Sequence, residues 1–164
     1  MLQGKAFKFG DDISTDLIIP GRFLHLRSNL PELAKHVLED ADPTFVRRVK
    51  PGDFVVGGSN FGLGSSREHA PLVIKIAGVS AVLAKSFARI FFRNAINIGL
   101  PVLVCDTDKI SDGDGLEIDL GQGIVHDSTN GVNLTFNPVP DIMLRILNEG
   151  GLVPYIQKHK DLVI

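Results

Sequence analysis

The spacing of hydrophobic and polar residues divides the chain into two parts with different patterns. In the first part, short apolar runs alternate with amphipathic segments long enough for helices. We expect strands at 4–9, 54–56, 79–84 and 100–105, and helices at 31–40, 45–49, 67–77 and 86–98. This alternation is typical of a β/α unit, in which right-handed crossovers join parallel strands.

Beyond residue 106 the pattern changes to a period of two. Residues 116–120 and 132–136 alternate apolar and polar side chains and are flanked by Gly-Gln-Gly and Thr-Asn-Gly turns, which predicts antiparallel hairpin strands. A helix is expected over about 140–149. The predicted fold class is therefore α/β, with a parallel β/α core, an added antiparallel β portion, and one domain over residues 1–164.

Composition and charge narrow the class of protein. Apolar residues make up 44% of the chain and charged residues 22%, which are ordinary proportions for a globular protein. The 17 lysines and arginines stand against 19 aspartates and glutamates, so there is no electrostatic argument for binding nucleic acid or an anionic membrane. No apolar stretch approaches the roughly 18 residues of a spanning helix, and the N-terminus lacks a signal-peptide core, so we expect a cytoplasmic protein.

The strongest local feature is a glycine-rich loop between an expected strand and an expected helix. Residues 57–69 read Gly-Gly-Ser-Asn-Phe-Gly-Leu-Gly-Ser-Ser-Arg-Glu-His. Glycines let a ligand approach the backbone closely, and a helix start offers N–H groups to an anion. No lysine lies between Lys50 and Lys75, which excludes a P-loop, and Arg67 stands where a dinucleotide fingerprint requires a third glycine.

Two interpretations of this loop are equally compatible with its spacing. Ser65 and Glu68 match a capping box, although Pro71 would then cost the helix a hydrogen bond at its sixth position. The other interpretation is a site for a small carboxylate or phosphate, where Arg67 can form a bidentate pair and the neighbouring serines add hydroxyl groups.

The chain has a single cysteine, Cys105, in the apolar run 100–105. There we expect a small buried hydrophobic residue and not a reactive thiol. One cysteine cannot by itself supply the thiolates that an iron–sulfur cluster needs, and the histidines are too scattered to predict a metal site. Any such cluster would have to be held by another chain.

Several segments together resemble the small subunits of 3-isopropylmalate dehydratase and homoaconitase, which correspond to the swivelling C-terminal domain of aconitase. The matching segments are 11–16 with 19–22, 57–69, 85–90 and 94–101. The resemblance implies a three-layer swivelling β/β/α domain and a hydro-lyase activity. It also implies a separate large subunit carrying a [4Fe–4S] cluster, in a heterodimer or heterotetramer, with no cofactor bound by this chain.

The same resemblance implies roles for individual residues. Ser65 would be the catalytic base, whose alkoxide removes a proton from the substrate. Ser66 and Arg67 would hold a substrate carboxylate and stabilise that alkoxide, for which a guanidinium fork is well suited. Thr15 and Asp16 match positions near the family's active site. His69 and Arg89 are assigned no catalytic role because capping or a place on a helix face explains them.

In this family the loop that follows Pro20 and Gly21 contacts the variable group of the substrate. Leu24 and Leu26 favour the isopropyl group of isopropylmalate, a small dicarboxylate of leucine biosynthesis, whereas Arg27 would suit the extra carboxylate of homoaconitate. We expect isopropylmalate and keep homoaconitate as the alternative. A non-catalytic module that binds a small anion is the alternative from another class.

Overall fold

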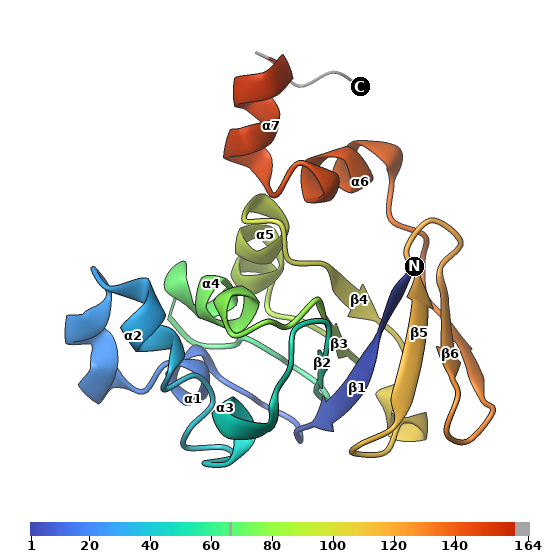
Figure 1. The fold of residues 1–164 in the computed structure, drawn as a ribbon, viewed down its shortest axis with the longest axis horizontal. Helices are drawn as coiled ribbons and strands as arrows, with labels where there is room; N and C mark the ends of the chain where they lie inside the picture. The colour runs from blue at the N-terminus through green and yellow to red at the C-terminus, as the bar shows by residue number, and fades with distance from the viewer. Residues whose placement is uncertain (66, 160–164) are drawn as a thin grey trace.

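In the computed structural model, which describes residues 1–65 and 67–159, seven strands form one mixed sheet (Figure 1). Its order is β4-β3-β2-β1-β5-β6-β7. The strands are β1 (Leu2–Lys8), β2 (Phe54–Val56), β3 (Ala81–Ala84), β4 (Val102–Val104), β5 (Gly115–Asp119), β6 (Ile124–Asp127) and β7 (Asn133–Thr135). Strands β1 to β4 are parallel, and β1 pairs with β5 in the antiparallel sense, so β1 joins the two parts of the sheet.

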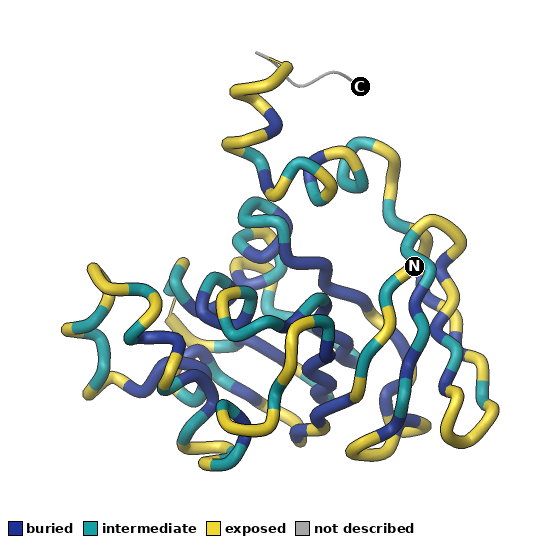
Figure 2. Tube along the Cα trace, in the orientation of Figure 1, coloured by how far each residue is buried: buried dark blue, intermediate teal, exposed yellow. Residues whose placement is uncertain are grey.

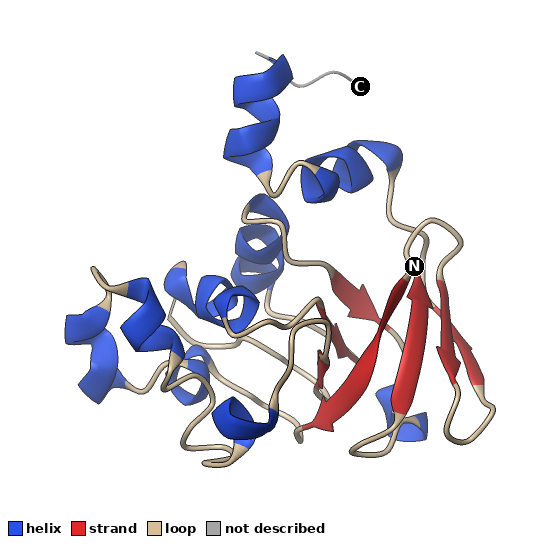
Figure 3. Cartoon of the chain, in the orientation of Figure 1, coloured by secondary structure: helices blue, strands red, loops and turns tan. Residues whose placement is uncertain are grey.

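Five helices cover one face of the parallel strands, and two more follow the antiparallel strands in the described part of the chain (Figure 3). The first five are α1 (Thr15–Ile18), α2 (Leu30–Ala34), α3 (Phe45–Arg48), α4 (His69–Ile76) and α5 (Arg89–Asn97). The last two are α6 (Asp141–Asn148) and α7 (Leu152–His159), and both contact α5. Short 3-10 helices form at η1 (Gly21–Leu26) and η2 (Thr107–Lys109).

The two faces of the parallel strands are buried in different hydrophobic clusters, because successive side chains of a strand point to opposite faces. In β2, Val55 packs in the cluster beneath the helices, whereas Phe54 and Val56 pack in the second cluster. The antiparallel strands contribute to that second cluster Leu116, Ile118, Val125 and Leu134. The sheet is curled, so that its antiparallel strands pack against one face of its parallel strands while the helices pack against the other face. The result is three layers, with buried residues along the central strands (Figure 2).

The predicted fold class and the four strands and four helices of the parallel part are confirmed, with shifted ends. The helix expected over 31–40 ends earlier, at Ala34, and turns follow it; among them, buried Leu38 has a positive φ of 57°. Segments 116–120 and 132–136 are indeed strands, but β6 lies between them and pairs with both. Strand β6 escaped prediction because one of its two inward positions is a carboxylate, Asp127, where the pattern requires an apolar side chain.

Asp127 and its neighbour Asp114 form a buried acid pair at the antiparallel strands, with exposed fractions of 0% and 6%. Asp127 Oδ1 accepts hydrogen bonds from the N–H groups of Thr129 (3.0 Å) and Asn130 (3.2 Å), while Asp127 Oδ2 has no donor among the described residues. Burial, and then the neighbouring Asp114, raise the pKa of Asp127, whereas the neighbouring Asp127 lowers the pKa of Asp114. The pKa values of the two carboxyl groups are therefore shifted in opposite directions, upward for Asp127 and downward for Asp114.

We expect Asp127→Asn to become more stable relative to wild type as pH rises. In wild type, the raised folded-state pKa of Asp127 means that its protonated form stabilises the fold. This stabilisation is complete below the unfolded-state pKa of about 3.9 and is lost as pH rises through the folded-state pKa. Asparagine is the same size, does not titrate, and can donate to Asp114. Urea unfolding between pH 4 and pH 8 measures the difference.

The control is Asp112→Asn, because Asp112 is exposed and also accepts a backbone N–H, from Lys8 at 2.8 Å. It replaces an exposed carboxylate outside the buried pair by the same amide, and so measures the effect of the substitution alone. Parallel profiles for Asp127→Asn and wild type would show that folding does not raise the pKa of Asp127.

Candidate functional site

The glycine-rich loop is held on both sides by backbone hydrogen bonds to distant parts of the chain. Segment 10–15 provides one side, through Gly58 N–H to Gly10 O (3.0 Å), Asp12 N–H to Ser59 O (2.8 Å), Gly62 N–H to Ile13 O (2.7 Å) and Thr15 N–H to Leu63 O (2.8 Å). Segment 85–88 provides the other, through Lys85 N–H to Gly58 O (3.0 Å), Phe61 N–H to Ser86 O (3.0 Å) and Ala88 N–H to Phe61 O (2.9 Å). Three segments far apart in sequence therefore meet at one place.

Thr15 and Ser65 are in direct contact at the end of this loop. Ser14 caps α1, since its Oγ accepts a hydrogen bond from Leu17 N–H at 3.1 Å, and this places Thr15 in the first turn. Thr15 is 3% exposed, and its Oγ1 donates to Ser65 O at 3.0 Å. A buried hydroxyl thus fixes the backbone of Ser65, which is itself exposed.

Arg67 is fastened to the C-terminal end of α1. Its Nη1 donates to Asp16 Oδ1 at 2.9 Å and to Ile19 O at 2.7 Å. The Arg67 side chain is 21% exposed and that of Asp16 is 71% exposed. In the described part of the chain these contacts occupy only Nη1, so Nη2 and Nε of the guanidinium stay available for an anion.

The capping-box interpretation of Ser65 and Glu68 is wrong. Helix α4 begins at His69 after Glu68, and no side chain caps it; the Arg67 N–H instead donates to Ser65 O at 2.8 Å in a tight turn. Pro71 then lies in the first turn, where its missing N–H costs no helical hydrogen bond. Ser65 is therefore released from helix initiation and belongs to the loop.

A cavity of about 210 Å³ lies between this loop and the start of α5. It is lined by Thr15, Gly62, Gly64, Ser65, Arg67, Ala88, Arg89, Ile90, Phe91 and Asn94. This volume is below the roughly 300–1,000 Å³ of pockets that enclose drug-sized ligands, and it fits a small anion or one part of a larger site. Gly64 has a φ of 108°, a backbone conformation that favours glycine.

Of the residues predicted for the site, the structure brings Thr15, Ser65 and Arg67 to the cavity, with Asp16 bonded to Arg67. Ser66 lies outside the described residues. Sequence reasoning did not place Arg89 and Asn94 in the site, although they belong to segments that carry the family resemblance.

The loop expected to contact the variable group of the substrate packs in part against the core. Leu24 and Leu26 belong to η1, are half-buried and pack against the cluster beneath the helices. Arg27 is exposed, and its Nη1 donates to Leu24 O at 3.3 Å. None of the three lines the cavity of the described chain.

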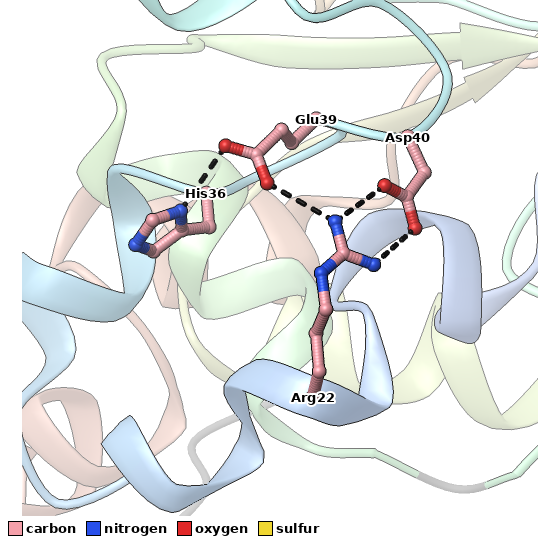
Figure 4. A network of polar contacts seen from close by, with 4 residues as sticks. All are labelled: Arg22, His36, Glu39 and Asp40. Carbon is pink, nitrogen blue, oxygen red and sulfur yellow. Dashed lines mark hydrogen bonds and ion pairs between the residues drawn. The ribbon is translucent and has the colours of Figure 1, made fainter.

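Arg22 ties this loop to the turns that follow α2 (Figure 4). Its guanidinium donates to both carboxylate oxygens of Asp40, at 2.9 Å and 2.6 Å, and to Glu39 at 3.2 Å. The Arg22 hydrogen bond lowers the pKa of Asp40. Glu39 also contacts His36 Nδ1 at 3.2 Å, and the His36 ring stacks on Phe23 with 3.8 Å between ring centroids. These contacts hold the start of the loop against the core.

Cys105 is buried, as predicted, and burial raises the pKa of its thiol to about 12. A buried thiol with a raised pKa matches the small hydrophobic residue expected there and not a reactive thiol. Residues 1–65 and 67–159 contain no group of three or more histidine, cysteine, aspartate or glutamate side chains placed to hold a metal ion. Within the same residues, every helix is too short or too polar to cross a membrane.

Comparisons with known proteins agree on one family. The model of the aconitase C-terminal domain matches residues 8–107. The chain is 67% identical over 163 residues to 3-isopropylmalate dehydratase small subunit 2 of Archaeoglobus fulgidus, covering 99% of both chains. It is 59% identical over 160 residues to small subunit 1 of the same enzyme from Thermotoga maritima, covering 97% of this chain and 96% of that one.

A solved structure supports the same grouping. The crystal structure of 3-isopropylmalate dehydratase from Methanocaldococcus jannaschii superposes with a TM-score of 0.92 at 46% sequence identity. The match covers 97% of this chain and 95% of that chain.

The Arg22 contacts give a test of how the loop is held. In Arg22→Ala we expect faster hydrogen exchange of the amides at 23–29, because the loop loses its bond to Asp40, while the unfolding midpoint changes little because exposed ion pairs stabilise weakly. Hydrogen exchange followed by mass spectrometry measures this.

The matched control is Arg48→Ala. Arg48 also pairs with an aspartate, Asp42 at 3.0 Å, and also lies over a phenylalanine ring, but on α3. Unchanged exchange at 23–29 in Arg22→Ala, or an equal increase in Arg48→Ala, would show that Arg22 does not hold the loop.

Proposed function

Because this chain belongs to the aconitase C-terminal domain family, and within it to the small subunits of 3-isopropylmalate dehydratase, we propose that it is the small subunit of that hydro-lyase. The reaction interconverts 2-isopropylmalate and 3-isopropylmalate by dehydration and rehydration in leucine biosynthesis. The observation that carries the proposal is the convergence of Thr15, Ser65 and Arg67 on one cavity, with Asp16 bonded to the guanidinium.

In this proposal Ser65 Oγ, as an alkoxide, takes the proton from the substrate carbon next to the one that loses hydroxide. A serine hydroxyl is a poor base in water, so the alkoxide requires nearby donors and positive charge. Arg67 supplies that charge, and its orientation is fixed by Asp16 and Ile19 O. Thr15 holds the Ser65 backbone through its bond to Ser65 O, which limits the positions that Oγ can take.

Arg67 also provides the main recognition of the substrate. The bonds from Nη1 leave Nη2 and Nε, two donors on one edge of a planar group, and such an edge suits a bidentate pair with a carboxylate. The family places Ser66 beside this carboxylate as a further donor. A dicarboxylate bound in this way presents its reacting carbon toward Ser65.

The partner in this proposal is a large subunit, in a heterodimer or heterotetramer, and the relatives named as small subunits support it. Its [4Fe–4S] cluster, when bound, supplies the Lewis acid that assists departure of hydroxide. This chain contributes the base and the carboxylate site.

Isopropylmalate is the proposed substrate because the similar proteins share that name. Leu24 and Leu26 remain proposed apolar contacts for the isopropyl group, and Arg27 is the residue that would favour homoaconitate instead. The seven strands of one sheet support treating residues 1–164 as a single domain. The cytoplasm stays the predicted compartment.

The direct test of the base is Ser65→Ala in complex with the large subunit. We expect kcat for dehydration of 3-isopropylmalate to fall by roughly 10²–10⁴-fold, the range for loss of a positioned acid or base, with KM changed much less. The Thr15 bond is unaffected because it uses the backbone oxygen of Ser65. Formation of the unsaturated intermediate is followed by absorbance.

Ser59→Ala is the matched control, since Ser59 lies in the same loop but does not line the cavity. Its kcat should stay close to wild type. A Ser65→Ala enzyme with wild-type kcat would show that another group removes the proton.

For Arg67→Lys we expect kcat/KM to fall by about 10²-fold, which corresponds to about 2.7 kcal/mol of transition-state stabilisation. One ammonium cannot contact Asp16 and Ile19 O and still present a fork to a carboxylate. Asp16→Asn, which keeps the acceptor Oδ1, should cost less than Arg67→Lys. Steady-state kinetics measure both variants. Equal losses of kcat/KM would show that the reaction does not need a bidentate contact between Arg67 and the substrate carboxylate.

A further inference from the structure

The outward face of α5 borders the cavity and carries positive charge with an exposed apolar residue. Arg89 and Ile90 line the cavity, and Arg93 lies one turn after Arg89 on the same face. Ile90 is 48% exposed, and both arginines are exposed. The opposite face of α5 is buried through Phe91 and Ala95.

These two arginines have no counter-ion in the described part of the chain. The ion pairs of residues 1–65 and 67–159 include those of Arg22, Arg48 and Arg67 but none of Arg89 or Arg93. Such an exposed pair is free to meet acidic groups of another molecule.

The local sequence works against α5 as an isolated helix. Its first turn contains Arg89 and no acidic residue, and the residue before it, Ala88, gives no side-chain cap. Arg89 and Arg93 also repel each other at a spacing of four residues. Residues that destabilise a helix locally, without a stabilising contact elsewhere in the described chain, are characteristic of functional surfaces.

We propose that this face, formed by Arg89, Ile90 and Arg93, is the docking surface for the large subunit, which meets it with acidic side chains and an apolar recess for Ile90. The inference rests on the proposed function for the identity of the partner. Continuity with the cavity supports that choice, because a surface that borders half of a shared active site is where the chain carrying the other half must pack. Charge complementarity then requires acidic groups on the partner.

The test measures binding of the purified full-length chain to the purified large subunit at several salt concentrations. Arg93→Glu is the main variant, since Arg93 does not line the cavity. We expect Kd to rise at least tenfold and to become less sensitive to salt. Ile90→Asp should also raise Kd at least tenfold.

Each variant has a matched control elsewhere on the surface. Arg47→Glu makes the same change of charge at an exposed arginine of α3, and Ile76→Asp places the same charge at an isoleucine of α4 that is 42% exposed. Both should bind like wild type. Circular dichroism and thermal unfolding verify that all four variants fold, and variants that fail are replaced by Arg93→Gln and Ile90→Ser.

Binding and turnover separate the two proposals. Wild-type affinity in Arg93→Glu and Ile90→Asp, or equal weakening by the controls, overturns the docking surface even if the complex is an active dehydratase. Weaker binding by Arg93→Glu and Ile90→Asp, with normal binding by the controls, supports the docking surface whether or not the complex is active. A wild-type complex without dehydratase activity would overturn the proposed function only. Absence of binding by the wild-type chain overturns both.

Discussion

The site depends on backbone hydrogen bonds that hold the glycine-rich loop between segments 10–15 and 85–88. Close approach of three chain segments requires glycine at particular positions. A side chain at Gly62 would collide with the Phe91 ring, and one at Gly58 would collide with the Asp11 carboxylate. Because the loop cannot move without breaking these contacts, Thr15, Ser65 and Arg67 keep fixed positions although they come from distant parts of the sequence.

The features that could be predicted from the sequence are those that depend on the local spacing of hydrophobic residues or on a specific motif. Alternation of apolar runs with amphipathic segments was enough for the parallel strands, and the Gly-Ser-Ser-Arg-Glu-His string was enough to direct attention to Ser65 and Arg67. The burial of Cys105 also followed from its apolar neighbours. Each of these depends on residues close together in the chain.

Features that depend on tertiary context were not accessible in this way. Strand β6 was hidden by Asp127, a carboxyl group that is buried among backbone N–H groups of the following turn and beside Asp114. The ion pair of Arg22 joins residues 18 positions apart, across turns that include Leu38 in a left-handed conformation. The place of Arg89 and Asn94 on the cavity wall likewise depends on how the loop packs against α5.

Under the proposed function, the exposure of Ser65 gives a reason why this chain alone would not remove a proton from substrate. In water, the charge of Arg67 is screened, and its effect on a serine hydroxyl is small. Covering the cavity with a second protein surface would exclude water and strengthen the same attraction several-fold without moving either residue. In the proposed complex, the loop would supply the geometry in advance and burial by the partner would supply the electrostatic environment. A base that forms only on assembly would then act only when the group that assists the leaving hydroxide is also present.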